Sequence, residues 1–286
     1  MRHFLVSSVI ALAISALNLP AFAAMGAVND VSKNMGMSPH KALYDIKLAG
    51  VKSGAQILNI SGQMVFEWQP SCDGWLSTHR FNLLYEYADS EPMMIASDFN
   101  VFESFDGKTL DFTSQRKRNG QLFEEFMGNA TLDETGQGKA VYSRPDGLEF
   151  QLKPNSLFPT MHTIRMLNAI KNKEKFFHSS VFDGADEEGP VEINAFIGKS
   201  VTPTFSETTA KNINADLVKP SAHTIRLAFF PLSQNAPSPD YEMNIDLHDN
   251  GVISSMFIDY GNFSITQKLR ALEPLKSACP SESLQQ

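Results

Sequence analysis

Apolar and polar residues alternate along much of the chain from Ala42 onward, and this pattern predicts β-strands. In residues 241–248 the odd positions are Tyr, Met, Ile and Leu, and every even position is polar. The same period of two recurs in residues 148–152, 225–229 and 263–270. A strand points successive side chains to opposite faces of its sheet, so each of these segments is expected to have one buried and one solvent-facing side.

Short turn sequences rich in glycine, asparagine and aspartate separate these runs. They lie at residues 106–107, 119–120, 145–147, 183–184 and 249–251. Glycine, and often asparagine or aspartate, adopts the positive φ angles that tight hairpins require. Roughly a dozen strands joined by such turns predict a mainly β fold, a large antiparallel meander in a single domain spanning residues 39–286. Because the alternation is identical in a closed barrel, a half-open barrel and a β-spiral, it does not choose between them.

One segment, about residues 158–175, departs from the alternation and predicts a helix. Pro159 suits the first helical turn, where its missing N–H costs nothing. Four apolar residues at a spacing of three form one face: Met161, Ile164, Leu167 and Ile170. We expect this face to cover the concave side of the curved sheet, either as ordinary packing or as a ligand-lining surface. A shorter helical turn is expected at Ser38-Pro39, and a long connection at residues 200–222.

The first 23 residues have the pattern of a signal peptide. Arg2 precedes an apolar run, and Ala21-Phe22-Ala23 supplies the small residues that a signal peptidase requires. The run is shorter than the roughly 20 apolar residues of a membrane span. We therefore expect residues 1–23 to be cleaved, residues 24–38 to form a flexible lead-in, and the mature chain to be exported without a transmembrane anchor.

The charge of the chain disfavours two classes of partner. Its 24 basic and 32 acidic residues give a net charge of −8, and loss of Arg2 with the signal peptide would leave 23 − 32 = −9. Nucleic acid requires a basic surface for its phosphates, and anionic lipid headgroups attract basic segments. This balance therefore argues against binding nucleic acid and against electrostatic docking on a membrane.

The chain has two cysteines, Cys72 and Cys279, which are 279 − 72 = 207 positions apart. In an oxidising compartment two thiols can close one disulfide, so we expect a structural Cys72–Cys279 bond and no thiol free for catalysis. Such a bond would tie an early strand region to the C-terminal tail and, in a spiral, hold the two ends in register. Both tryptophans, Trp68 and Trp75, flank Cys72, and they either pack around the bridge or line a ligand site. The 21 Phe and 12 Met residues likewise suit an ordinary core or an adaptable lipid cavity.

Motifs for catalysis, cofactors or metals are not found in the sequence. It contains no His-Glu-x-x-His, Gly-x-Ser-x-Gly, phosphate-binding glycine loop or Cys-x-x-Cys. We expect His162 to pack or cap within the helix, and His248, next to a turn, to be an exposed hairpin residue. A Ser-His-Asp triad need not be adjacent in sequence, so a hydrolase site built on His162 or His223 stays open as an alternative.

Several motifs resemble one known family. They are His40-Lys41-Ala42-Leu43-Tyr44-Asp45, Ser53-Gly54-Ala55, Gly62-Gln63-Met64, Glu67-Trp68, Cys72-Asp73-Gly74-Trp75 with the distal Cys279, and residues 157–163 (Leu-Phe-Pro-Thr-Met-His-Thr). In this order they resemble the EipB family of periplasmic cell-envelope integrity proteins. The resemblance implies a Gram-negative, alphaproteobacterial periplasmic protein with a many-stranded β-spiral, similar to the half-open barrels of the LolA/LolB lipoprotein carriers. It also implies the Cys72–Cys279 disulfide and an association with stress resistance, and it supplies no catalytic residue.

These patterns together predict an exported, non-enzymatic periplasmic protein that maintains cell-envelope integrity through binding. The expected partner is a lipid or lipoprotein held between sheet and helix, or another periplasmic or outer-membrane protein that docks on a strand edge. An envelope-directed hydrolase with an unrecognised site is the alternative. No cofactor is expected, and the sequence does not determine an oligomeric state.

Overall fold

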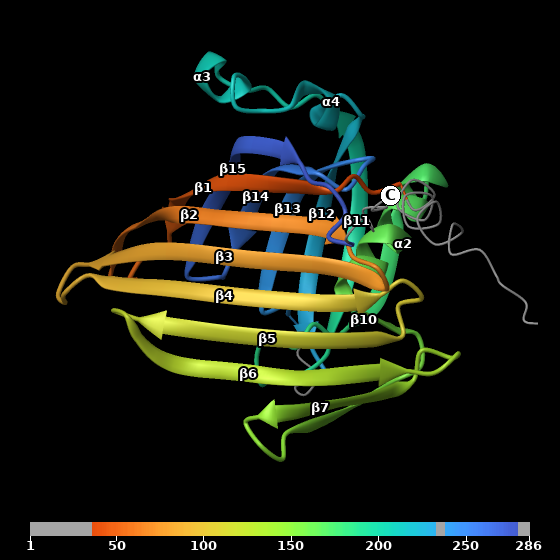
Figure 1. Ribbon diagram of the computed structural model, residues 1–286. Helices are drawn as coiled ribbons and strands as arrows, with labels where there is room; N and C mark the ends of the chain where they lie inside the picture. The colour runs from red at the N-terminus through yellow and green to blue at the C-terminus, as the bar shows by residue number, and fades with distance from the viewer. Residues whose placement is uncertain (1–35, 233–237, 280–286) are drawn as a thin grey trace, which may run out of the picture.

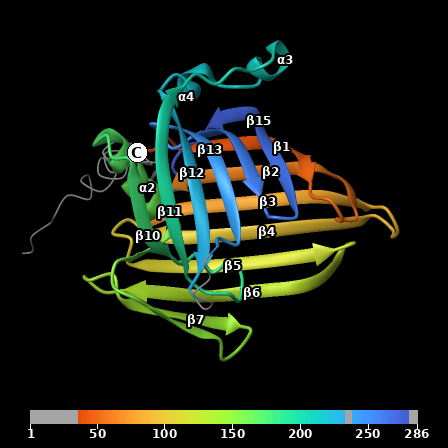
Figure 2. The same cartoon turned by 180° about the vertical axis from the view of Figure 1, so that it is seen from behind.

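The computed structural model describes residues 36–232 and 238–279. The predicted signal peptide, most of the predicted lead-in and the tail after Cys279 lie outside these residues. The strands of the described part form one 15-stranded sheet (Figure 1, Figure 2). Their bounds are β1 His40–Val51, β2 Ile57–Pro70, β3 Gly74–Tyr87, β4 Met93–Ser104, β5 Thr109–Arg118, β6 Gln121–Leu132, β7 Gly138–Arg144, β8 Glu149–Leu152, β9 Ser156–Leu157, β10 Phe176–Val181, β11 Val191–Val201, β12 Ala222–Pro231, β13 Tyr241–His248, β14 Ile253–Asp259 and β15 Phe263–Pro274.

The order of the strands explains the shape of the sheet. It runs β8-β7-β6-β5-β4-β3-β2-β1-β15-β14-β13-β12-β11-β10-β9, and every neighbouring pair is antiparallel except β9–β10. The first and last strands therefore pair in the middle of the sheet, while the two edge strands are separated only by residues 153–155. Since so short a connection joins its two edges, the sheet curls into a nearly closed barrel. This confirms the predicted mainly β, barrel-like fold.

The main helix, α2, spans Pro159–Lys171 and lies at one end of the barrel (Figure 1). It ends four residues before the predicted residue 175 because the chain turns to enter β10. The connection predicted at 200–222 carries two short helices, α3 Glu207–Ala210 and α4 Ala215–Val218. The helical turn predicted at Ser38-Pro39 is wrong, because these residues lead directly into β1. In the described part of the chain, no helix combines the length and the apolar character needed to cross a membrane.

The buried apolar residues form three clusters. The largest joins α2 to the inner faces of strands from both halves of the sheet, and it includes Trp68, Trp75 and Ile164. A second gathers around Phe112 on the inner side of β4–β8, and a third around Ile46 at β1–β3, β14 and β15. Met64 and Met243 pack against both the first and the third cluster, so partly buried side chains connect these two clusters.

A buried glutamate attaches α2 to the sheet. Phe158, at the N-cap, has no side chain that can accept a hydrogen bond from the helix. Glu103 of β4, 1% exposed, takes this role: its two carboxyl oxygens accept hydrogen bonds from the backbone N–H groups of Thr160 (2.7 Å) and Met161 (2.9 Å). A carboxylate at this position satisfies free N–H groups and interacts favourably with the helix dipole.

Candidate functional site

The Cys72–Cys279 disulfide is formed, with 4.7 Å between the two Cα atoms. Cys72 lies in the β2–β3 turn, and Cys279 follows β15, so the bond links segments on either side of β1, near the middle of the sheet. The C-terminal segment also donates a hydrogen bond from the N–H of Ala278 to the carbonyl of Pro70 (2.8 Å). The expectation that the bond holds the two ends of a spiral in register is wrong, because those ends are β8 and β9.

The structure places the proposed helix face and the two tryptophans in one packed cluster. Ile164, Leu167 and Ile170 are buried, and Met161 is half-buried at the edge of the cluster. Trp68 (2% exposed) and Trp75 (1% exposed) stack on each other with 4.7 Å between ring centroids. These side chains fill the space between helix and sheet themselves, which favours packing over ligand lining at this position.

Farther into the barrel, several side chains of the inner face are only partly buried. His79 of β3 lies between two aromatic rings, 4.8 Å from Phe66 and 5.8 Å from Phe99 between centroids. Burial lowers the pKa of His79 to about 4, so its imidazole is neutral at pH 7. The neighbouring inward positions Ser77, Ser97 and Ser114 are buried and carry small hydroxyl side chains.

Several large apolar side chains on this inner face remain half-exposed. The alternation of burial and the strand register place them inward, because each pairs across the sheet with other inward residues. They are Met64, Phe66, Phe81, Ile95, Phe99, Phe229 and Met243. All of them except Ile95 pack against at least one of the three clusters, and part of the surface of each side chain stays accessible to solvent. The interior therefore offers some apolar surface that the described side chains do not cover.

The loop after β10 lies against the inside of β5–β8. The backbone of Gly184 contacts the ring of Phe112, and the Tyr142 hydroxyl donates a hydrogen bond to the carbonyl of Asp186 (2.7 Å). Burial raises the pKa of Asp183 in this loop to about 6. The loop therefore brings a partly protonated carboxyl group into the barrel, near Tyr241. The sequence indicated only a turn here.

The histidines do not assemble a catalytic triad among the described residues. His162 packs on Phe177 (5.6 Å between centroids), and burial lowers its pKa to about 4. His223 lies 3.5 Å from the carboxylate of Asp249, but within the described ranges no serine hydroxyl hydrogen-bonds to the side chain of either residue; the backbone N–H of Asp249 donates to the carbonyl of Ser221 (2.8 Å). The described residues also contain no cluster of three or more His, Cys, Asp or Glu side chains that could hold a metal ion.

The prediction that His248 is exposed is wrong. Its side chain is 0% exposed, and its Nδ1 lies 2.8 Å from the carbonyl oxygen of Pro220. His248 does precede a turn, but the connection that follows α4 passes over the outer side of this strand and buries the ring. Alternation along β13 alone gave no signal of that cover.

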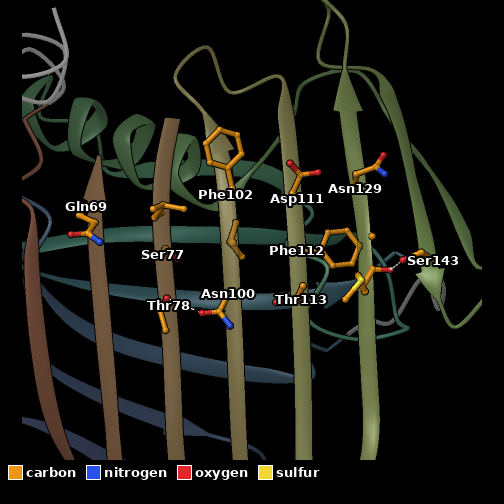
Figure 3. A pocket seen from close by; sticks show the side chains of 14 residues that line it. Gln69, Ser77, Thr78, Asn100, Phe102, Asp111, Phe112, Thr113, Asn129 and Ser143 are labelled. Atoms are coloured by element: carbon orange, nitrogen blue, oxygen red, sulfur yellow. Dashed lines mark hydrogen bonds between the residues drawn. The ribbon is translucent and has the colours of Figure 1, made fainter. Parts of the chain in front are cut away.

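A hollow of about 510 Å³ lies on the outer face of the first half of the barrel. Figure 3 shows its side chains on strands β2–β7, with α2 and the strands of the second half behind the sheet. Thr78 donates a hydrogen bond to the side-chain oxygen of Asn100 (2.8 Å), and the amide of Asn100 donates one to Asp98 (2.6 Å). Sequence patterning indicated only a solvated strand face here.

Comparisons with known proteins agree with this fold. Residues 31–276 match the family model described as EipB-like. The chain is 26% identical over 267 residues to the Cell envelope integrity protein EipB of Brucella abortus (strain 2308), covering 92% of this chain and 94% of that protein. It also superposes, with a TM-score of 0.77 and 26% identity, on the crystal structure of a β-barrel-like protein of a domain of unknown function from Brucella abortus, covering 84% of this chain and 99% of that one. The chain belongs to the EipB-like family.

Proposed function

We propose that this protein acts in the periplasm to maintain cell-envelope integrity by holding an acyl chain, from a lipid or a lipoprotein, inside its nearly closed barrel. One observation carries the proposal: apolar side chains on the inner face, Phe66, Phe99 and Met243 among them, pack against the buried clusters and yet are only partly buried. Apolar surface kept in contact with water is unfavourable, and an acyl chain would cover it.

The envelope role is supported by family membership and by the name of the Brucella relative. The signal-peptide pattern in residues 1–23 supports export to the periplasm. Binding, in place of catalysis, fits the surroundings of His79 on the inner face, which lies between aromatic rings with no carboxylate partner among the described residues.

The interior also favours an uncharged or weakly polar ligand. His79 is neutral at pH 7, and the inward serines supply hydroxyl groups, which can donate and accept hydrogen bonds. An acyl chain attached through an ester or amide would place its apolar part on the aromatic rings and its carbonyl near these hydroxyls. The acyl chain would thus lie on the inner face of the sheet around His79, and not on the face of α2, which is already packed.

A pair of adjacent substitutions on β4 tests the proposal. Ile95 points inward and is half-exposed, so Ile95→Trp would fill the interior, whereas Met94 (42% exposed) points outward and Met94→Trp would not. Native mass spectrometry of the protein extracted under mild conditions should show bound lipid in the wild type and in M94W, and at least tenfold less in I95W.

The same variants can be compared in cells. In a deletion strain sensitive to detergent and cell-wall antibiotics, M94W should restore resistance and I95W should not. Equal melting temperatures for the two variants would exclude a folding defect. Lipid-free wild-type protein from repeated preparations would contradict the acyl-chain part of the proposal, and a deletion strain with unchanged resistance would contradict the envelope role.

A further inference from the structure

The outer hollow in Figure 3 is built from two rows of side chains that cross the strands at right angles. In the first row Leu76, Phe102, Asp111 and Asn129 are direct neighbours on β3–β6, and in the second Thr78, Asn100, Thr113 and Met127 are. Adjacent strands are about 4.8 Å apart, so a row from β2 to β7 extends for roughly 24 Å. The volume of about 510 Å³ is in the range of ligand sites.

We propose that this groove is a carbohydrate-binding site for a linear, neutral glycan that carries hydroxyl and acetamido groups. The site lies on the opposite face of the sheet from the acyl-chain site and does not depend on it.

The chemistry of the lining favours a neutral, polyhydroxylated ligand. Asp111 is the only charged side chain among its residues, and no basic side chain lines it, which excludes phosphate-bearing ligands. The hydroxyl groups and side-chain amides of Thr78, Asn100, Thr113 and Asn129 can each donate and accept hydrogen bonds, as sugar hydroxyls require. The apolar faces of sugar rings would lie on Leu76, Phe102 and Met127.

Two of these side chains are held in place before any ligand arrives. The side chain of Asn100 is oriented by Thr78 and Asp98. The ring of Phe102 lies on Gly74, where a Cβ atom would come within 2.8 Å of the ring. Fixed side chains lose little conformational entropy on binding, so this arrangement lowers the cost of binding a flexible glycan.

The geometry disfavours an extended peptide. A peptide that binds a sheet by strand addition needs an edge whose N–H and C=O groups are free. The strands below this groove, β3–β6, are paired on both sides. A ligand that crosses these strands can therefore hydrogen-bond only to side chains. An extended peptide in this position would leave many of its backbone N–H and C=O groups without a hydrogen-bond partner from the protein. A glycan has no backbone amide groups, so it does not have this cost.

Asp111 and Phe102, which face each other across β4 and β5, suit an acetamido group. The carboxylate of Asp111 can accept a hydrogen bond from the acetamido N–H while the methyl group packs on the ring of Phe102. The cross-strand neighbour of Asp111 on the other side, Asn129, can bond the acetamido oxygen.

Titration with a chito-oligosaccharide (linked N-acetylglucosamine units) tests the proposal, by calorimetry and by amide shifts in NMR spectra. The shifts should concentrate on β3–β6. Thr113→Trp would fill the groove from an outward, half-buried position and should weaken binding at least tenfold. Asn244→Ala, at an outward asparagine of β13, is the matched control and should bind as the wild type does.

Melting temperatures of T113W and N244A close to that of the wild type would show that both variants fold. The cello-oligosaccharide of the same length, which lacks acetamido groups, should bind at least threefold more weakly. The proposal is overturned by an absence of binding, by equal binding to T113W, by shifts confined to the inner face, or by an extended peptide that binds in place of the oligosaccharide. I95W should bind the oligosaccharide normally, so failure of the acyl-chain proposal would leave this one standing.

Discussion

At the scale of single residues, Glu103 shows most clearly how the position of a side chain sets its pKa. Burial raises its pKa to about 7, while hydrogen bonds from the N–H groups of Thr160 and Met161 act in the opposite direction. The carboxyl group of an unfolded chain titrates near 4.5. The folded protein therefore binds more protons than the unfolded one between these two values, and its stability falls as the pH rises through this window.

The direction of this pH dependence can be tested with Glu103→Gln, which keeps the shape of the side chain and removes its titration. Urea unfolding of both proteins from pH 5 to pH 8 should show the wild type losing free energy of unfolding relative to E103Q as the pH rises, by about 1–3 kcal/mol in total. A wild-type advantage that grows with pH would mean that the helix N-terminus, and not burial, controls this carboxyl group.

At the scale of elements, the end of α2 shows what the sequence could and could not predict. Met161, Ile164, Leu167 and Ile170 indicated the helix and its buried side correctly. The end was missed because the residue in left-handed conformation there is a lysine, Lys173 (φ 61°), where glycine is the usual signal. The N–H of Lys173 bonds the carbonyl of Ile170 (2.9 Å), and that of Glu174 bonds Ala169 (3.0 Å), the pattern of a Schellman motif.

This conformation predicts a stabilising substitution. Lysine at positive φ is strained and glycine is not, so Lys173→Gly should raise the free energy of unfolding by about 0.5–1 kcal/mol. Lys175→Gly, at the residue immediately before β10, is the control and should be neutral or destabilising. Chemical denaturation of both variants measures the difference, and a K173G variant less stable than the wild type would show that other contacts of Lys173 outweigh the strain.

The sites were harder to predict than the elements, for a physical reason. Alternation assigns a side chain to one face of a strand, but it contains no information on curvature or on what lies opposite. His248 was predicted to face solvent, because alternation along β13 does not show that the connection after α4, distant in sequence, buries its ring. The half-exposed Phe99 and the groove around Asn100 depend in the same way on how distant strands are placed. Short-range patterns specify strands well, whereas sites form between elements that are far apart in sequence.

At the scale of the whole molecule, the disulfide closes a long loop between the β2–β3 turn and the segment after β15, which lie on either side of β1. The bond removes conformational freedom from the unfolded chain, and a loop of 207 residues gives a large effect. Cys72→Ser should lower the free energy of unfolding by roughly 2–5 kcal/mol and loosen the residues after β15. Thermal unfolding with and without reductant, with C72S as the reduced reference, measures this. Equal melting under both conditions would show that the bond adds nothing to stability.

The pairing of β1 with β15 has a consequence for how the barrel is assembled. The strands β1–β8 and the strands β10–β14 can each pair with sequence neighbours as they emerge, but the two halves of the sheet are joined only through the last strand. Any process that delivers the chain from its N-terminus, whether synthesis or passage across a membrane, must therefore release nearly the whole chain before the sheet is complete. Until then the edges of β1 and β14 stay unpaired and can bind other strands, so a chaperone that shields these two edges would protect the protein at its most vulnerable stage.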